Sequence, residues 1–154
     1  MKCKICDKEA KYYDYDYEKD RQAVECYFIL MPFGTKKDEN GNTIDFDKIY
    51  NEFIKPSIID AGLEPIRADE EQIGGIIHKA MYERLMLCEY AVADLSLLNA
   101  NVFYELGVRH AIRPYSTVTL FENGSRLPFD VNFLRSIPYD RELSNLEELK
   151  ATLT

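Results

Sequence analysis

YAVADLSLLNANVFYELGVRHAI, residues 90–112, contains two periodic patterns in one short stretch. Residues 90–95 are mostly apolar, as in a short strand that is buried on both faces. Residues 101–112 carry apolar side chains at helical spacing, and Asn99 or Asn101 is suited to cap the helix that they predict. A strand followed closely by a helix indicates part of a βαβ unit.

The same alternation extends along the chain in both directions. Strands are predicted over 23–31, 63–69, 90–95, 117–121 and 135–139, and helices over 45–62, 70–89, 101–112 and 143–153. Strands and helices of these lengths indicate right-handed crossovers and a parallel sheet with both faces covered. The sequence therefore predicts an α/β fold with a doubly wound, five-stranded parallel sheet, flavodoxin-like or Rossmann-like, in a single domain.

Two segments interrupt the regular patterns. Residues 35–46 carry Asn40-Gly41 and several charges, which is typical of a loop. Pro56 lies inside the helix predicted to start at Asp45 and end at Gly62. Because proline lacks an amide proton and its ring crowds the preceding turn, we expect a kink or a break there.

Composition limits the classes of protein that the chain can represent. Its 154 residues are 46% hydrophobic, which is enough for one packed core, and residues 1–23 form a polar, tyrosine-rich N-terminal arm ahead of a domain at 24–154. The net charge of −8 argues against binding a nucleic-acid backbone. No apolar stretch approaches a membrane span or the core of a signal peptide. A cytoplasmic protein without nucleic-acid or membrane partners is expected.

The four cysteines are predicted to be thiols, because nothing in the sequence indicates an oxidising compartment. Cys26 and Cys88 lie in apolar patterns and are interpreted as small core residues. Cys3 and Cys6 form a Cys-x-x-Cys pair, which is half of a tetrahedral zinc site, but no second half follows. The alternatives are a zinc site completed by other ligands and a free pair in the arm; no cofactor is expected for the domain.

The predicted strand order places a ligand groove between the first and third strands. In such sheets the first and third strands are neighbours, and ligands bind beyond their carboxyl ends. The loop at 32–37 and the segment at 94–105 should therefore meet, although some sixty residues separate them. Glu105 would lie in the first turns of a helix, where the helix dipole favours an ionised acid. From spacing alone, a ligand-facing carboxylate and a helix-capping one are both open.

Helical spacing also groups side chains around this acid. Val102 and Leu106 belong to the apolar face that is expected to pack on the sheet. Asn101, Glu105 and Arg109 then share one i, i+4 stripe, which is predicted to face the groove or the solvent.

Three stretches of the chain resemble a known superfamily. CYFILMPFG, GLEPIRADE and above all ADLSLLNANVFYELGVRHA are similar to the nucleoside 2-deoxyribosyltransferase-like superfamily and its TIR-like and bacterial TRAF-binding-type relatives, over about residues 24–139. The resemblance implies that Glu105 of the Glu-Leu-Gly motif is a nucleophile and that Asp94 helps to bind or protonate the substrate. It also implies a homo-oligomer. Pro32-Phe33-Gly34-Thr35-Lys36 stands where the family has a glycine-rich loop, which leaves the substrate open.

The chemistry implied by the resemblance suits two carboxylates. An N-glycosidic bond breaks through an oxocarbenium-like state, which a carboxylate beside the anomeric carbon stabilises or captures as an ester. Glu105 is expected to stay ionised, and like-charge proximity is expected to raise the pKa of Asp94 so that it acts as an acid. The candidate substrate-binding residues are Pro32, Phe33, Gly34, Thr35, Lys36, Arg67, Asp69, Asn99, Asn101 and Tyr104.

Two functions follow as expectations. The first is binding of a nucleoside or nucleotide, with NAD among the candidates, and hydrolysis or transfer at its N-glycosidic bond. The alternative is a non-catalytic TIR-like domain that binds a nucleotide or serves in signalling or interaction.

Overall fold

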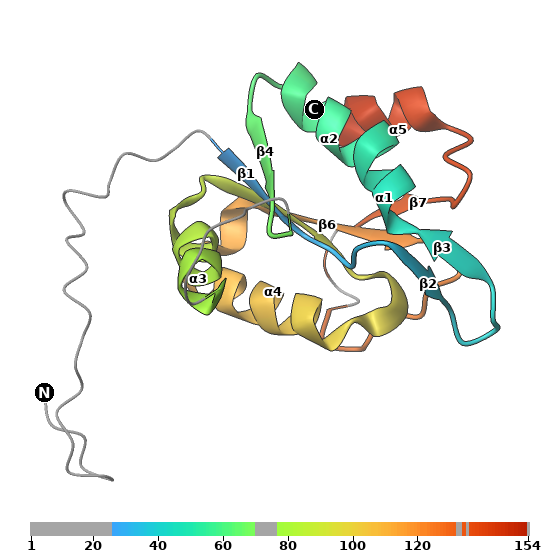
Figure 1. Cartoon of the computed structure of the whole chain (residues 1–154), viewed down its shortest axis with the longest axis horizontal. Helices are drawn as coiled ribbons and strands as arrows, with labels where there is room; N and C mark the ends of the chain where they lie inside the picture. The colour runs from blue at the N-terminus through green and yellow to red at the C-terminus, as the bar shows by residue number, and fades with distance from the viewer. Residues whose placement is uncertain (1–25, 70–76, 132–133, 135, 154) are drawn as a thin grey trace, which may run out of the picture.

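The computed structural model of the chain describes residues 26–69, 77–131, 134 and 136–153. A five-stranded sheet has the order β4-β1-β5-β6-β7, and every neighbouring pair of strands is parallel (Figure 1). The strands are β1 (Cys26–Leu30), β4 (Glu64–Arg67), β5 (Tyr90–Asp94), β6 (Thr117–Glu122) and β7 (Ser136–Tyr139). The first and third strands of this sheet are neighbours, which confirms the predicted doubly wound order.

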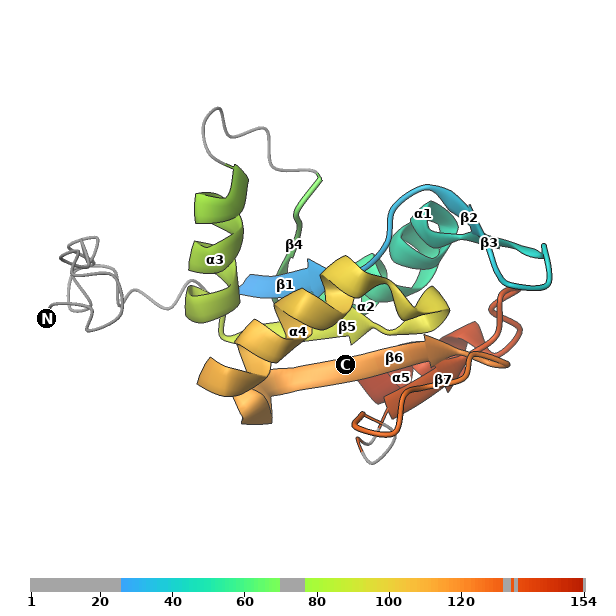
Figure 2. The same cartoon turned by 90° about the horizontal axis from the view of Figure 1, so that it is seen from below.

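Helices cover both faces of the sheet (Figures 1 and 2). One face carries α1 (Phe46–Ile49), η1 (Tyr50–Ile54), α2 (Lys55–Asp60) and α5 (Leu146–Leu153), and the other carries α3 (Ile77–Leu87) and α4 (Ala100–Ile112). Strand β1, which lies between β4 and β5, is buried along its whole length. Its side chains alternate between two apolar clusters, with Ile29 in the cluster on the α5 side and Phe28 in the cluster on the α4 side.

The loop predicted at 35–46 is wrong in part, because this segment forms a β-hairpin. Strands β2 (Thr35–Lys37) and β3 (Thr43–Asp45) pair in antiparallel register. The Asp38 carboxylate accepts hydrogen bonds from the backbone N–H groups of Asn40 and Asn42 at 2.9 and 2.8 Å, and these bonds close the turn. Each strand has only three residues, which is too short for an alternating pattern to stand out in the sequence.

The helix after the hairpin accommodates Pro56 without ending. Asp45 caps the helix by accepting a hydrogen bond from the Lys48 N–H, as its position predicts. The five residues Tyr50–Ile54, just before the proline, form a π-helical segment. A π-helical turn is wider than an α-helical one, so it leaves room for the proline ring and does not need the missing N–H. The kink or break expected at Pro56 is therefore a π-helical segment.

The prediction that all four cysteines are thiols is wrong for two of them, because Cys26 and Cys88 form a disulfide across 62 positions of sequence. Both side chains are buried, as predicted. Residue Tyr27 of β1 lies opposite Tyr90 of β5, so the register brings the two cysteines together. Sequence spacing alone carries no sign of this pairing. Cys3, Cys6 and the arm at 1–23 lie outside the described residues.

Two structural features are absent from the described residues, a membrane-spanning helix and a cluster of metal-binding side chains. None of their helices has the length and apolar character needed to cross a membrane. No group of three or more His, Cys, Asp or Glu side chains among them is arranged to hold a metal ion.

Candidate functional site

A cavity of about 220 Å³ lies at the carboxyl edge of the sheet, where the groove was predicted. It is lined by Ile29, Met31, Pro32, Phe33, Lys36, Ala68, Asn99, Asn101, Val102 and Glu105, and we call it the Glu105 cavity. The loop after β1 and the segment after β5 thus meet in space, as the strand order predicts. Of the candidate residues, Pro32, Phe33, Lys36, Asn99, Asn101 and Glu105 are brought together here.

Glu105 lies in the second turn of α4 and is half-buried. The described part of the chain offers its carboxylate no hydrogen-bond or ion-pair partner, and burial raises its pKa from 4.5 to about 7. Burial thus works against the expectation that this acid stays ionised near neutral pH. Near neutral pH the two protonation states are comparably populated, which suits proton transfer and nucleophilic attack alike.

Helix capping does not explain Glu105. The side chain of Asn99 caps α4, accepting hydrogen bonds from the N–H groups of Asn101 and Val102 at 3.0 and 3.3 Å. Glu105 comes six residues after this cap, beyond the reach of the free N–H groups in the first turn. The capping interpretation is thus excluded, and the carboxylate is left facing the cavity.

Asp94 is buried away from Glu105. The structure leaves its side chain 1% exposed and does not place it in the lining of the Glu105 cavity. Its carboxylate accepts hydrogen bonds from the Tyr139 hydroxyl at 2.7 Å and from the Ser96 N–H at 2.9 Å. Side chains alternate along a strand, so Asp94 shares the face of Val92, which packs on the α5 side, whereas α4 covers the other face.

The pKa of Asp94 is raised, as expected, but for another reason. The main cause is desolvation by complete burial, and the acid that adds to the rise is Glu122, not Glu105. The structure therefore does not join the two predicted acids in one pair.

Arg109 does not face the groove or the solvent, so the predicted i, i+4 stripe is wrong at this residue. Its side chain is fully buried, and its guanidinium donates to the carbonyl oxygens of Leu85, Cys88 and Glu89 at 2.9, 2.7 and 2.8 Å. It also donates to the hydroxyl oxygen of Ser116 at 3.0 Å. Its Nε donates to the hydroxyl oxygen of Thr117 at 3.2 Å, so Arg109 ties the end of α3, α4 and the start of β6 together.

Arg67 and Gly34 support the loop that lines the cavity without lining it themselves. Arg67 is buried and pairs with Asp47 at 2.9 Å and with Asp69 at 2.6 Å, and its guanidinium stacks over the Tyr50 ring. Asp47 also accepts a hydrogen bond from the Gly34 N–H at 3.2 Å. Gly34 has a φ of 65°, a left-handed conformation that glycine adopts readily. These contacts hold the Pro32–Phe33 turn against α1.

Three predicted residues are exposed around the site. Lys36 lines the cavity, whereas Thr35 pairs with Asp45 in the hairpin and does not line it. Tyr104 is 57% exposed, and its hydroxyl lies 2.5 Å from that of Tyr82, so it braces α4 against α3. Thr35 and Tyr104 are thus placed beside the cavity and not in its wall.

Sequence reasoning missed four lining residues, Ile29, Met31, Ala68 and Val102. The predicted strand order could have indicated Ala68, because this residue follows β4, and β4 lies next to β1 on the side away from β5. No protein-family model and no curated protein matches this chain.

Proposed function

We propose that the chain binds a nucleoside or nucleotide in the Glu105 cavity and breaks or transfers at its N-glycosidic bond. The observation that carries this proposal is a half-buried carboxylate with a pKa of about 7, in a cavity at the switch point of the sheet, to which the described residues offer no partner. Glu105 acts in its ionised form, either as a nucleophile that forms a glycosyl ester or as a charge that stabilises the oxocarbenium-like state.

The lining of the cavity is consistent with such a ligand. Phe33 is 47% exposed and offers a ring face on which a base can stack. Asn101 offers donors and acceptors for sugar hydroxyls, and Lys36 offers a charge for a phosphate. The volume lies below the range of roughly 300–1,000 Å³ for drug-sized ligands. One ring of a nucleoside would therefore enter, with the remainder at the mouth.

The lining also favours a particular kind of leaving group. Glu105 is the only acid among the described lining residues, and Asp94 is buried elsewhere. A neutral base leaves well only when an acid protonates it, whereas a pyridinium base departs as a neutral molecule without a proton. We therefore propose NAD-type substrates ahead of neutral nucleosides.

A substrate panel tests the proposal directly. The pure chain is incubated with NAD, nucleosides and nucleoside monophosphates, and the release of free base is followed by chromatography. We expect release from NAD, with a rate that rises with pH up to about 7 as Glu105 ionises. Glu105→Gln keeps the shape but loses the charge, and its rate should fall by at least about 10³-fold.

The control is Glu148→Gln, which removes an exposed acid on α5 and should leave the rate unchanged. A wild-type rate for folded Glu105→Gln would refute the role of this carboxylate. Absence of base release from every substrate, together with a nucleotide-induced rise in melting temperature, would favour the non-catalytic binding domain.

A further inference from the structure

A second cavity, of about 240 Å³, lies at the same edge of the sheet, beyond β6 and β7. Its lining comes from the hairpin, from the turn after β5 and from the loops after β6 and β7: Lys37, Asp38, Glu39, Asn40, Leu97, Leu98, Glu122, Gly124, Ser125, Arg126 and Arg141. We call it the Arg141 cavity. None of these residues was among the candidate site residues, although Lys37, Leu97 and Leu98 belong to the two segments predicted to meet at the groove. None takes part in the proposed reaction.

A thin wall separates the two cavities. Lys36 lines one and Lys37 the other, because neighbouring residues of β2 point to opposite sides of the strand. In the same way, Leu98 lines the Arg141 cavity and Asn99 the Glu105 cavity. The two spaces are therefore distinct, with separate lining residues.

The guanidinium of Arg141 already has two acidic partners inside the Arg141 cavity. Arg141 donates through Nε to Glu122 at 2.7 Å and through Nη2 to Asp38 at 2.6 Å. The lining as a whole carries three cationic and three acidic side chains. An anion would gain little from such a lining, because Arg141 is already paired with two carboxylates. These carboxylates can instead accept hydrogen bonds from a neutral ligand that carries several donors.

A buried hydrogen-bond network fixes the backbone of Glu122 beside the cavity. The Glu122 N–H donates to the Ser96 hydroxyl oxygen at 2.8 Å, and that hydroxyl lies 3.1 Å from the Tyr139 hydroxyl. Tyr139 in turn donates to Asp94 at 2.7 Å. This buried network fixes Glu122 before any ligand arrives, which lowers the entropy cost of binding.

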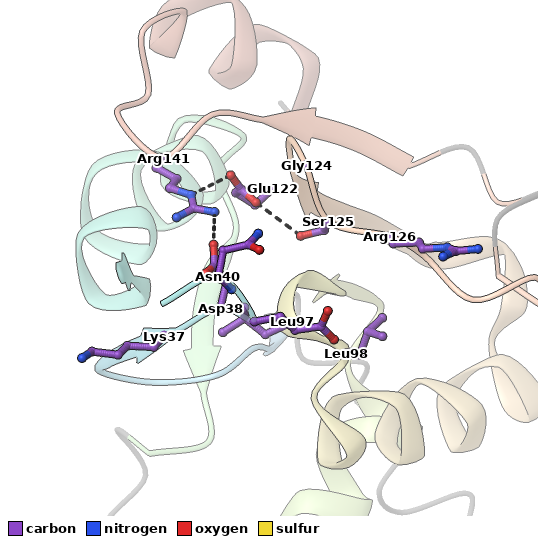
Figure 3. A pocket seen from close by; sticks show the side chains of 11 residues that line it. Lys37, Asp38, Asn40, Leu97, Leu98, Glu122, Gly124, Ser125, Arg126 and Arg141 are labelled. Atoms are coloured by element: carbon purple, nitrogen blue, oxygen red, sulfur yellow. Dashed lines mark hydrogen bonds and ion pairs between the residues drawn. The ribbon is translucent and has the colours of Figure 1, made fainter. Parts of the chain in front are cut away.

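Arg141, Glu122 and Ser125 lie on one side of the lining, which we call the polar side, and Leu97 and Leu98 lie on the other, which we call the apolar side (Figure 3). Asp38 and Asn40 lie between the two sides (Figure 3). The side chains of Lys37 and Arg126 extend outward in opposite directions, so their charges do not point at the centre (Figure 3).

The apolar side is built on strained backbone. Leu97 and Leu98 have φ values of 61° and 50°, in a left-handed region that residues other than glycine rarely adopt. Leu98 is nevertheless 44% exposed. Strain of this kind persists where the surrounding structure enforces it, and it is concentrated at ligand sites.

We propose that the Arg141 cavity binds a single neutral, polyhydroxylated ring, such as a pentose or a hexose. Sugar hydroxyls both donate and accept, which matches the guanidinium, carboxylate and hydroxyl groups on the polar side. The C–H face of the ring packs on Leu97 and Leu98. The volume fits one ring, because it lies below the range of roughly 300–1,000 Å³ for drug-sized ligands.

Amide NMR spectra of the ¹⁵N-labelled full chain test this proposal. D-ribose and D-glucose are titrated separately, and inorganic phosphate serves as the anionic comparison. We expect saturable shifts of the Leu97, Leu98, Gly124 and Ser125 amides with at least one sugar and none with phosphate. Ser125→Ala removes one hydroxyl partner and should weaken sugar binding about fivefold.

Two variants separate this site from the Glu105 cavity. Lys36→Gln and Glu105→Gln alter only the other lining and should bind the sugar as the wild type does. Shifts that do not saturate, or that Ser125→Ala leaves unchanged, overturn the proposal. Phosphate-induced shifts at these amides that Arg126→Gln abolishes would instead assign the cavity to anions and would also overturn it. None of these outcomes depends on base release, so the proposed function is tested separately.

Discussion

The two cavities at the carboxyl edge of the sheet shift the pKa of a carboxylate in opposite directions. In the Arg141 cavity, Asp38 and Glu122 share one guanidinium, which lowers the pKa of Asp38 to about 2. In the Glu105 cavity, where the described part of the chain offers Glu105 no partner, burial raises its pKa to about 7. Asp38 is therefore fixed as an anion near neutral pH, whereas Glu105 can change its charge there. The position on the sheet is shared, and the presence of a cation decides the chemistry.

The largest effect should come from Arg109, a buried charge that does have partners. Arg109→Met leaves the carbonyl groups of Leu85, Cys88 and Glu89 without their donor. We expect the free energy of unfolding in urea to fall by about 3–4 kcal/mol. Arg113→Met, which removes one hydrogen bond to the Met86 carbonyl, is the matched control and should cost about 1 kcal/mol. Equal losses for the two variants would contradict the structural role given to Arg109.

Asp94 tests whether a buried, hydrogen-bonded acid behaves differently from Glu105. Asp94→Ala leaves the Tyr139 hydroxyl and the Ser96 N–H without their acceptor. The free energy of unfolding should fall by about 2–3 kcal/mol. If the chain releases base, the rate per folded molecule should change far less than in Glu105→Gln. A rate loss as large as that of Glu105→Gln, in a fully folded sample, would restore Asp94 as a catalytic acid.

Glu105 should destabilise the fold when it is ionised. Its pKa is higher in the folded chain than the ordinary value of 4.5, so its contribution to stability is complete below pH 4.5 and is lost as the pH rises through about 7. Glu105→Gln does not titrate. We expect it to raise the free energy of unfolding by about 1–3 kcal/mol at pH 8 and to have little effect at pH 4. Urea unfolding at the two pH values measures this, and a loss of stability at pH 8 would contradict it.

The smallest effect separates two neighbouring asparagines that line the same cavity. Asn99→Ala removes the cap of α4 and should lower the free energy of unfolding by about 1 kcal/mol. Asn101→Ala removes an exposed side chain and should change it by less than about 0.5 kcal/mol. Thermal unfolding of both variants compares them under one set of conditions. If Asn101→Ala were the more damaging variant, the assignment of the cap would be wrong.

Sheet order and groove position were accessible from the sequence because they depend on patterns repeated over many residues. The continuous apolar run ending at Met31 marks a strand buried on both faces, and this is β1, which lies between β4 and β5 in the sheet. Once β1 and β5 are neighbours, the meeting of Pro32 with Asn99 follows from geometry.

The orientation of individual side chains was not accessible in the same way. Period-two alternation indicates that Asp94 shares a face of the sheet with Val92. It does not indicate which helices cover that face. Helical spacing places Arg109 on the stripe of Glu105. It does not show that the end of α3 packs against α4 at this residue. The pairing of Cys26 with Cys88 required the strand register. The family resemblance, a homo-oligomer, a cytoplasmic location and the bound nucleotide stay predictions.

The Cys26–Cys88 cross-link has a mechanical consequence. If the chain were stretched between its ends, tension would pass from Cys26 directly to Cys88 through the sulfur atoms, and the segment between them would bear none of it. That segment accounts for 62 positions of sequence, or about 210 Å of extended chain at about 3.4 Å per residue. A single-molecule pulling trace of the oxidised chain would be shorter than that of the reduced chain by this length. The loop after β1, the hairpin and the helix after it, all within that segment, would be shielded from the force.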